Sequence, residues 1–187
     1  MSMFAVWTHP YPEAPPSAAY AASARGRKWL LSAAMAYVTR EAREELLGTI
    51  GDAIDELGRA LGALGDAYEQ LDERTGDALE EELFRPAQAA YGRAKRTYTG
   101  FAGRHGLTAD RAFEPVSPGA ASRGVRAFVD IAVEAVEEAD TILADLQDSL
   151  RPVEVGDAEL RAGLAEVREL LGALPERARR LISRFGR

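Results

Sequence analysis

The sequence predicts an all-α protein: an antiparallel up-and-down four-helix bundle of long helices, with an additional N-terminal helix and an extended Pro/aromatic-rich N-terminal arm. Apolar residues recur at spacings of three and four along most of the chain, which is typical of amphipathic helices. No segment has the alternation and hairpin turn that indicate paired strands. Four segments have similar lengths, roughly 40–50 Å at about 1.5 Å per residue, and are joined by short connections. These segments are residues 40–74, 77–105, 118–150 and 157–184.

The first sixteen residues are predicted to form the arm, and residues 17–187 a single helical-bundle domain. Prolines crowd the end of the arm and exclude a helix there, because proline lacks an N–H and disfavours helix before it. The arm also carries Trp7, His9 and Tyr11, whereas disordered tails are poor in aromatic residues. We therefore expect it to dock, either on its own bundle, on a second copy or on a partner.

Residues 17–38 form the predicted additional helix. A helix running without interruption to Arg74 would be nearly 90 Å long at about 1.5 Å per residue, so we expect a break. The break is placed near Gly26 or at Thr39, since Thr39 suits the cap of a helix with Glu41 in its first turn.

The clearest periodicity lies in residues 50–71, where apolar residues follow the a and d positions of a heptad. They are Ile50, Ile54, Leu57, Leu61, Leu64, Tyr68 and Leu71. Gly51, Gly58 and Gly65 repeat at one flank of this seam. An interior glycine costs a helix about 1 kcal/mol relative to alanine and needs a packing reason. We expect tight helix packing against these glycines; the alternative is drift in an alanine- and glycine-rich sequence.

Gly76 is predicted to end this helix and Asp77 to begin the next, which Pro86 should kink or restart. Its apolar row runs Phe84, Ala87, Tyr91, Ala94, Tyr98, Phe101 and His105. Further along, Ser117 and Pro118 resemble a helix cap and first turn. Pro152 should stop that helix, Asp157 cap the next, and Pro175 kink or restart it.

The chain has 30 acidic and 23 basic residues, for a net charge of −7, and this charge is unevenly distributed. Residues 83–109 contain five bases and no acid, and the last eleven residues contain five arginines. The bases either pair with the acidic helices beside them in the bundle or form a surface for an anion or an acidic partner. No nucleic acid is expected, because neutralising phosphates requires an excess of Lys and Arg.

The chain has no cysteine and two histidines, which excludes disulfides, thiolate nucleophiles and most transition-metal sites. No phosphate-binding loop or nucleophile elbow is present. We therefore expect no catalytic residue, metal or cofactor, although an enzyme with a carboxylate-bound metal or an arginine–tyrosine site remains an alternative. Neither a signal peptide nor a transmembrane segment is apparent, so a cytoplasmic protein is expected.

The predicted function is that of a non-enzymatic interaction or assembly protein, an adaptor or scaffold that binds a protein partner or a second copy in a homodimer. The partner-binding candidates are Trp7, His9, Tyr11, Arg177, Arg180 and Arg184. Peripheral membrane contact through residues 177–187 is a minor variant. The alternative is a bundle that binds a small molecule or lipid. Its ligand-binding candidates are Tyr91, Tyr98, Phe101, His105, Arg93 and Arg96.

Overall fold

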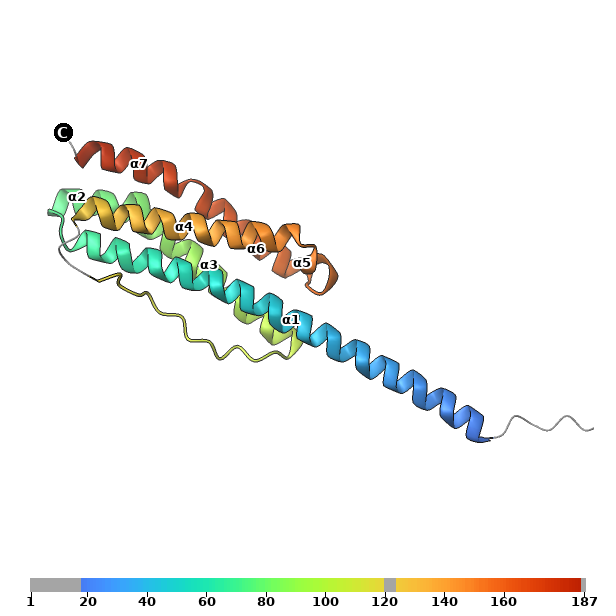
Figure 1. Ribbon diagram of the computed structural model, residues 1–187. Coiled ribbons are helices and arrows are strands. Elements are labelled where there is room, and N and C mark those ends of the chain that lie inside the picture. The colour runs from blue at the N-terminus through green and yellow to red at the C-terminus, as the bar shows by residue number, and fades with distance from the viewer. Residues whose placement is uncertain (1–17, 120–123, 186–187) are drawn as a thin grey trace, which may run out of the picture. The chain divides into compact units, whose positions relative to one another are not determined.

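The computed structural model describes the backbone of residues 18–119 and 124–185 and, within them, the side chains from Met35 to Arg184 (Figure 1). Every regular element in these ranges is a helix, which confirms the predicted all-α class. The predicted arm, residues 1–16, lies outside the described residues. The chain divides into two compact units, residues 1–39 and residues 40–187, and each is described by itself.

The first helix, α1, runs without interruption from Ala18 to Tyr68. The predicted break near Gly26 or at Thr39 is therefore wrong. The Thr39 hydroxyl donates to the carbonyl oxygen of Met35 at 2.9 Å, which is a bond made within a helix and not at its start. The boundary between the two units follows Thr39, inside this helix.

The next helix, α2 (Glu73–Leu79), begins earlier than predicted, because Asp72 and not Asp77 is its cap. The Asp72 carboxylate accepts from the backbone N–H of Thr75 at 3.1 Å and from its hydroxyl at 2.9 Å. Gly76, predicted to end a helix, is buried within α2 instead. The Tyr68 ring packs there, and a Cβ on Gly76 would lie 3.1 Å from it.

A π-helical turn, η1 (Glu80–Phe84), joins α2 to α3 (Arg85–His105). The backbone N–H of Arg85 donates to the carbonyl of Glu80, five residues earlier. Pro86 follows directly as the second residue of α3 and has no N–H to donate. The helix type changes just before Pro86, where the sequence predicted a kink or a restart.

Gly106 ends α3 in the left-handed conformation, with φ of 61°. Residues 107–119 then form an extended segment, here named the strap, and α4 (Val125–Asp148) follows. The predicted helix start at Ser117–Pro118 is wrong, because the Ser117 hydroxyl caps no helix. It donates to the Asp66 carboxylate on α1 at 2.6 Å.

The C-terminal part consists of α5 (Arg151–Glu154), α6 (Ala158–Gly172) and α7 (Leu174–Phe185). Asp157 caps α6 as predicted, accepting from the N–H of Leu160 at 2.7 Å. α4 ends before Pro152, which lies in the first turn of α5, and α7 begins at the residue before Pro175.

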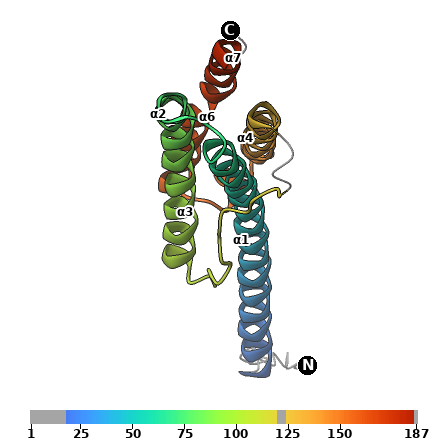
Figure 2. The same ribbon diagram turned by 90° about the vertical axis from the view of Figure 1, so that its left-hand side faces the viewer.

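One core joins these helices, and the part of α1 after Thr39 lies beside α3, α4 and α6 around it (Figure 2). α3 and α6 pack tightly at Gly163, where an added Cβ would lie 2.7 Å from Cγ2 of Thr97. Most members of the predicted apolar rows pack inward, but Tyr68 and Leu150, predicted at the ends of two rows, are 44% and 59% exposed. The fully buried members of these rows include Ile50, Ile54, Leu57, Phe101, Phe128, Leu143, Leu160 and Leu164.

Candidate functional site

The predicted ligand row lies on α3, where Tyr91, Tyr98 and Phe101 are buried and His105 is half-buried. The Tyr98 ring meets Phe113 of the strap edge-on, with ring centroids 5.0 Å apart. The Phe101 and His105 rings are 4.6 Å apart. Protein side chains therefore pack directly against this row.

Burial raises the pKa of both tyrosines, Tyr91 and Tyr98, above the usual value, and the charge of Asp55 raises that of Tyr91 further. Both phenols are consequently neutral near pH 7 and cannot serve as bases there. Among the residues that the structure describes, the buried Tyr91 hydroxyl has no hydrogen-bond partner. Lys95 lies over its ring, 5.0 Å from the centroid, and donates to the carbonyl of Phe113 at 3.4 Å.

The strap covers the glycine-bearing face of α1. A Cβ on Gly58 would lie 3.0 Å from the Glu114 carbonyl oxygen, and one on Gly62 would overlap the carbonyl of Val116. The Val116 N–H donates to the Gly58 carbonyl at 3.4 Å. Of the three glycines expected to meet a neighbouring helix, only Gly58 meets a backbone, and that backbone belongs to an extended segment and not to a helix. Gly51 faces the Arg111 side chain instead. Gly65 has open space.

Arg111 anchors the strap to α1. Its guanidinium donates to Asp52 at 2.9 Å and also to Asp55, and it lies over the ring of Phe113, 5.8 Å from the centroid. The contacts of Arg111 tie two acids of α1 to the strap, and Phe113 of the strap meets Tyr98 of α3.

The bases of α3 pair mainly with α6. Arg104 makes two bonds to Asp157, at 2.8 and 2.9 Å, and His105 Nε2 is 3.0 Å from the same carboxylate. The Arg104 guanidinium, with the Leu160 N–H and His105, holds the pKa of the Asp157 carboxyl well below its usual range. The predicted internal pairing occurs here, but with α6 and not with the first and third predicted helices.

A groove between α3 and α6 is lined by Arg93, Arg96 and Arg104. Arg93 lies 2.6 Å from Glu166, and Arg104 lies 2.7 Å from Glu159. The two predicted ligand-binding arginines, Arg93 and Arg96, thus line the same groove. The Glu166 carboxylate already neutralises Arg93, whereas Arg96 is exposed.

The C-terminal candidates lie on α7. Arg184 pairs with Glu82 at 2.6 Å, Arg177 lines a groove with α3 and α6, and Arg180 is exposed. Leu181 is buried in the core and Ile182 packs against it. The apolar side of α7 therefore contacts this chain's own helices. The other partner candidates, Trp7, His9 and Tyr11, lie outside the described residues.

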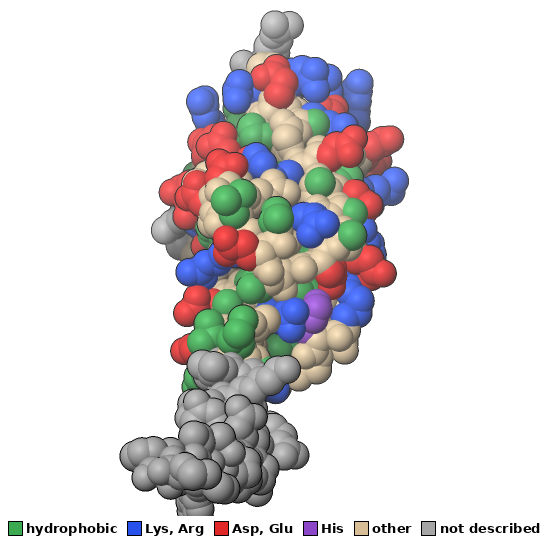
Figure 3. Space-filling view, turned by 90° about the vertical axis from the view of Figure 1, so that its right-hand side faces the viewer, with side chains coloured by type: hydrophobic (Ala, Val, Ile, Leu, Met, Phe, Trp, Pro, Cys, Tyr) green, Lys and Arg blue, Asp and Glu red, His purple; other side chains and the backbone are tan. Residues whose placement is uncertain are grey.

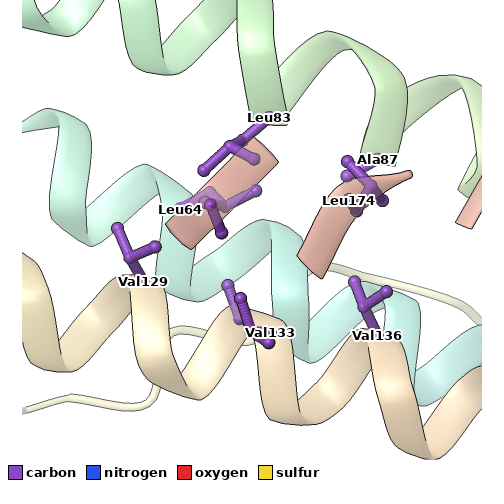
Figure 4. A pocket seen from close by; sticks show the side chains of 9 residues that line it. Leu64, Leu83, Ala87, Val129, Val133, Val136 and Leu174 are labelled. Carbon is purple, nitrogen blue, oxygen red and sulfur yellow. The ribbon is translucent and has the colours of Figure 1, made fainter. Parts of the chain in front are cut away.

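A small apolar cavity lies inside the core, where the side chains of Leu64, Leu83, Val129 and Val136 point toward one another (Figure 4). Its volume is about 10 Å³, and no polar surface lines it. A water needs roughly 10–15 Å³ and two or more polar partners. The cavity is therefore a packing gap and not a ligand site.

The described part of the chain contains no group of three or more potential metal ligands. Across the same residues, none of the helices has the length and apolar character needed to span a membrane. No family model matches the chain, and no curated protein or solved structure matches it either.

One exposed feature was missed by the sequence analysis. Met35, Tyr37 and Val38 on α1 are 72%, 68% and 63% exposed. They belong to residues 29–39, a run of eleven residues without a charge, here named the uncharged segment. Its large apolar residues are Trp29, Leu30, Leu31, Met35, Tyr37 and Val38. Periodicity did not reveal it, because apolar residues occur at nearly every position; the length of the uncharged run was the available signal.

Proposed function

We propose that this chain is a non-enzymatic assembly protein, an adaptor or scaffold, and that the uncharged segment of α1 is the surface through which it contacts another protein chain. The supporting observation is the exposure of Met35, Tyr37 and Val38 within one turn of helix. Exposed apolar residues that adjoin one another mark interaction surfaces, whereas scattered single ones are ordinary.

The three side chains leave α1 in different directions. Successive residues of an α-helix are about 100° apart, so Met35 and Val38 share a side and Tyr37 points away from it. A helix that is apolar on all sides is normally enclosed by other protein. This arrangement supports a binding element that another protein chain covers at least on the side shared by Met35 and Val38.

Two equally exposed valines elsewhere make the contrast clear. Val153 on α5 and Val116 on the strap are 62% and 63% exposed, like Val38. Val153 stands between Arg151 and Glu154 in the sequence, and Val116 is the one large apolar side chain in its short stretch of the strap. On the face of residues 40–187 that Figure 3 shows, acidic and basic side chains are interspersed with hydrophobic ones. Val116 lies in an uncharged run of eight residues, 115–122, which holds no other large side chain besides proline. Only Val38 among the three lies in an uncharged run that contains several other large apolar residues.

The unit of residues 40–187 would support this element as an up-and-down four-helix bundle, made of the rest of α1, then α3, α4 and α6 with α7. The common core of these helices and the short connections between most of them support this architecture. The strap is the exception, because it returns along α1 before α4 begins.

Site-specific photo-crosslinking in cells tests the proposal. A benzophenone amino acid replaces Val38 in one variant of the full chain and Val153 in a matched control. We expect protein adducts at position 38 that are absent or much weaker at position 153. Equal adduct formation at positions 38 and 153 would overturn the proposed function. So would the absence of adducts both at position 38 and in a further variant with the same probe at position 35.

A further inference from the structure

We infer that the occupant of the uncharged segment is a second copy of this chain, with the two α1 helices crossing it antiparallel. The inference rests on the proposed function, since it names the partner of the same surface. It follows from the order in which charge is arranged along α1.

The charges on the two sides of the uncharged segment have opposite signs. Residues 17–28 contain three bases, Arg25, Arg27 and Lys28, and no acid. Residues 40–56 contain six acids and two bases. α1 is one helix over this whole stretch, so its sequence passes from a basic start through an apolar centre to an acidic second part.

An antiparallel pair places the basic start of each copy against the acidic part of the other. Pairing about residues 34 and 35 puts position 28 of one copy opposite position 41 of the other. A parallel pair would place bases against bases and acids against acids, which is unfavourable. Glu41 is exposed in the described chain, so the position needed for this contact is accessible.

The arrangement is self-complementary, which favours a second copy over an unrelated protein. With a twofold axis through the middle of the uncharged segment, both copies use the same surface patch. The apolar centres of the two copies then contact each other, and the basic end of each copy contacts the acidic end of the other. In this register Met35 of each copy lies beside the twofold axis and Val38 lies opposite position 31 of the other copy, so both are covered on the side of α1 that they share.

Charge reversal in the full chain tests the pairing by sedimentation equilibrium. Lys28→Glu and Glu41→Lys should each weaken self-association by about two- to tenfold, because each creates two like-charge contacts per pair. The double variant, or an equal mixture of the two single variants, should restore it. Arg126→Glu on α4 makes the same change in net charge away from α1 and should leave association unchanged. Weakening by all three reversals alike, or no rescue, would overturn the inference.

Crosslinking fixes the direction, and the natural absence of cysteine leaves no background. We expect a short bis-maleimide to link a Lys28→Cys chain to a Glu41→Cys chain in a mixture, with far less product from either variant alone. Efficient linkage of Lys28→Cys to itself would indicate a parallel pair and overturn the inference. So would an adduct at position 38 to residues 1–16 of the same chain, or to a vesicle lipid.

The two proposals fail separately. If position 38 forms adducts with other proteins while the purified chain stays monomeric, the antiparallel pair is wrong and the proposed function stands. If position 38 forms no protein adduct and the chain is monomeric, both are wrong.

Discussion

Two parts of the same helix differ in what covers them. From Leu46 to Ala67, α1 presents a regular apolar seam whose members are buried, and its glycine-bearing flank is covered by the strap at Gly58 and Gly62. The uncharged segment is at least as apolar, yet Met35, Tyr37 and Val38 are largely exposed. The two parts share one backbone conformation.

The difference shows that apolar content alone does not say where a helix is buried within its own chain. Between Leu46 and Ala67, charged residues lie between the residues of the apolar seam. Asp52 and Asp55 are examples, and both face outward and accept hydrogen bonds from Arg111. These charges restrict burial to one side, which the chain's own elements cover. The uncharged segment carries no charge that would restrict burial to one side.

The largest expected difference between the two parts is in stability. Leu57→Ala removes a fully buried side chain and should lower the free energy of unfolding by about 2–5 kcal/mol. Val38→Ala should change it by less than about 0.5 kcal/mol at concentrations where the chain is monomeric. Urea denaturation followed by circular dichroism measures both. A loss at Val38 as large as that at Leu57 would mean that both parts are equally covered within one chain.

Glycine replacement sharpens the comparison within the covered part. Gly62→Ala forces a methyl group into the Val116 carbonyl and should destabilise the protein by about 1–3 kcal/mol. Gly65→Ala meets nothing and should stabilise it by about 0.5–1 kcal/mol through helix propensity. Thermal unfolding distinguishes the two signs. Equal gains at both positions would show that the strap does not lie against α1.

The charge network between α3 and α6 gives a pH dependence that the uncharged segment cannot have. Because the Asp157 pKa is depressed below its unfolded value of 3.8, the folded state keeps this carboxylate ionised to lower pH. Its contribution is present above about pH 4 and is lost as pH falls below that. Asp157→Asn retains a capping side chain but should cost about 1–2 kcal/mol at pH 7.

That cost should shrink as the pH falls below about 4, since the wild type then loses the same charge. Asp130→Asn is a suitable control, because Asp130 lies 3.9 Å from Arg126 on an exposed part of α4. Unfolding curves from pH 2 to 7 check the trend. A cost for Asp157→Asn that is constant over this range would contradict the assigned cause.

The smallest expected effect concerns the anchor of the strap. Arg111→Gln removes the ion pairs with Asp52 and Asp55, which are partly exposed, and should cost about 0.5–1 kcal/mol at low salt. The cost should decrease in about 1 M salt, where the Debye length is about 3 Å. Hydrogen exchange at the Val116 N–H should accelerate in parallel. A salt-independent loss would indicate that packing on Phe113, and not charge, holds the strap.

The sequence predicted the helical class, the inward rows and the features fixed by local chemistry, such as the Asp157 cap and the break before Pro175. It failed where tertiary contacts replaced the local signal. Ser117 followed by Pro118 has the sequence pattern of a helix cap, but the Ser117 hydroxyl donates to the Asp66 carboxylate, about 50 residues earlier in the chain. Thr39 has the same ambiguity, resolved by its bond to Met35 inside the helix.

The candidate site was harder to predict for a physical reason. The aromatic row of α3 looked unusual in the sequence because buried tyrosines need hydrogen-bond partners. Phe113, which packs on Tyr98, comes from a segment predicted only as a loop, so this contact could not be predicted from the sequence. The uncharged segment was visible in the sequence but has no periodicity, and its exposure depends on what the rest of the chain leaves uncovered.

Sedimentation equilibrium of three proteins, each with all 187 residues, shows directly whether the uncharged segment joins two copies. They are the wild type, the double variant Met35→Lys/Val38→Lys, and the matched control Val153→Lys. If two copies pair through the uncharged segment, the wild type and Val153→Lys should have a mass above the 20.2 kDa of one chain. The double variant should have a mass of 20.2 kDa. A wild type that remains at 20.2 kDa up to the highest soluble concentration, or a double variant that associates as well as the wild type, would contradict it.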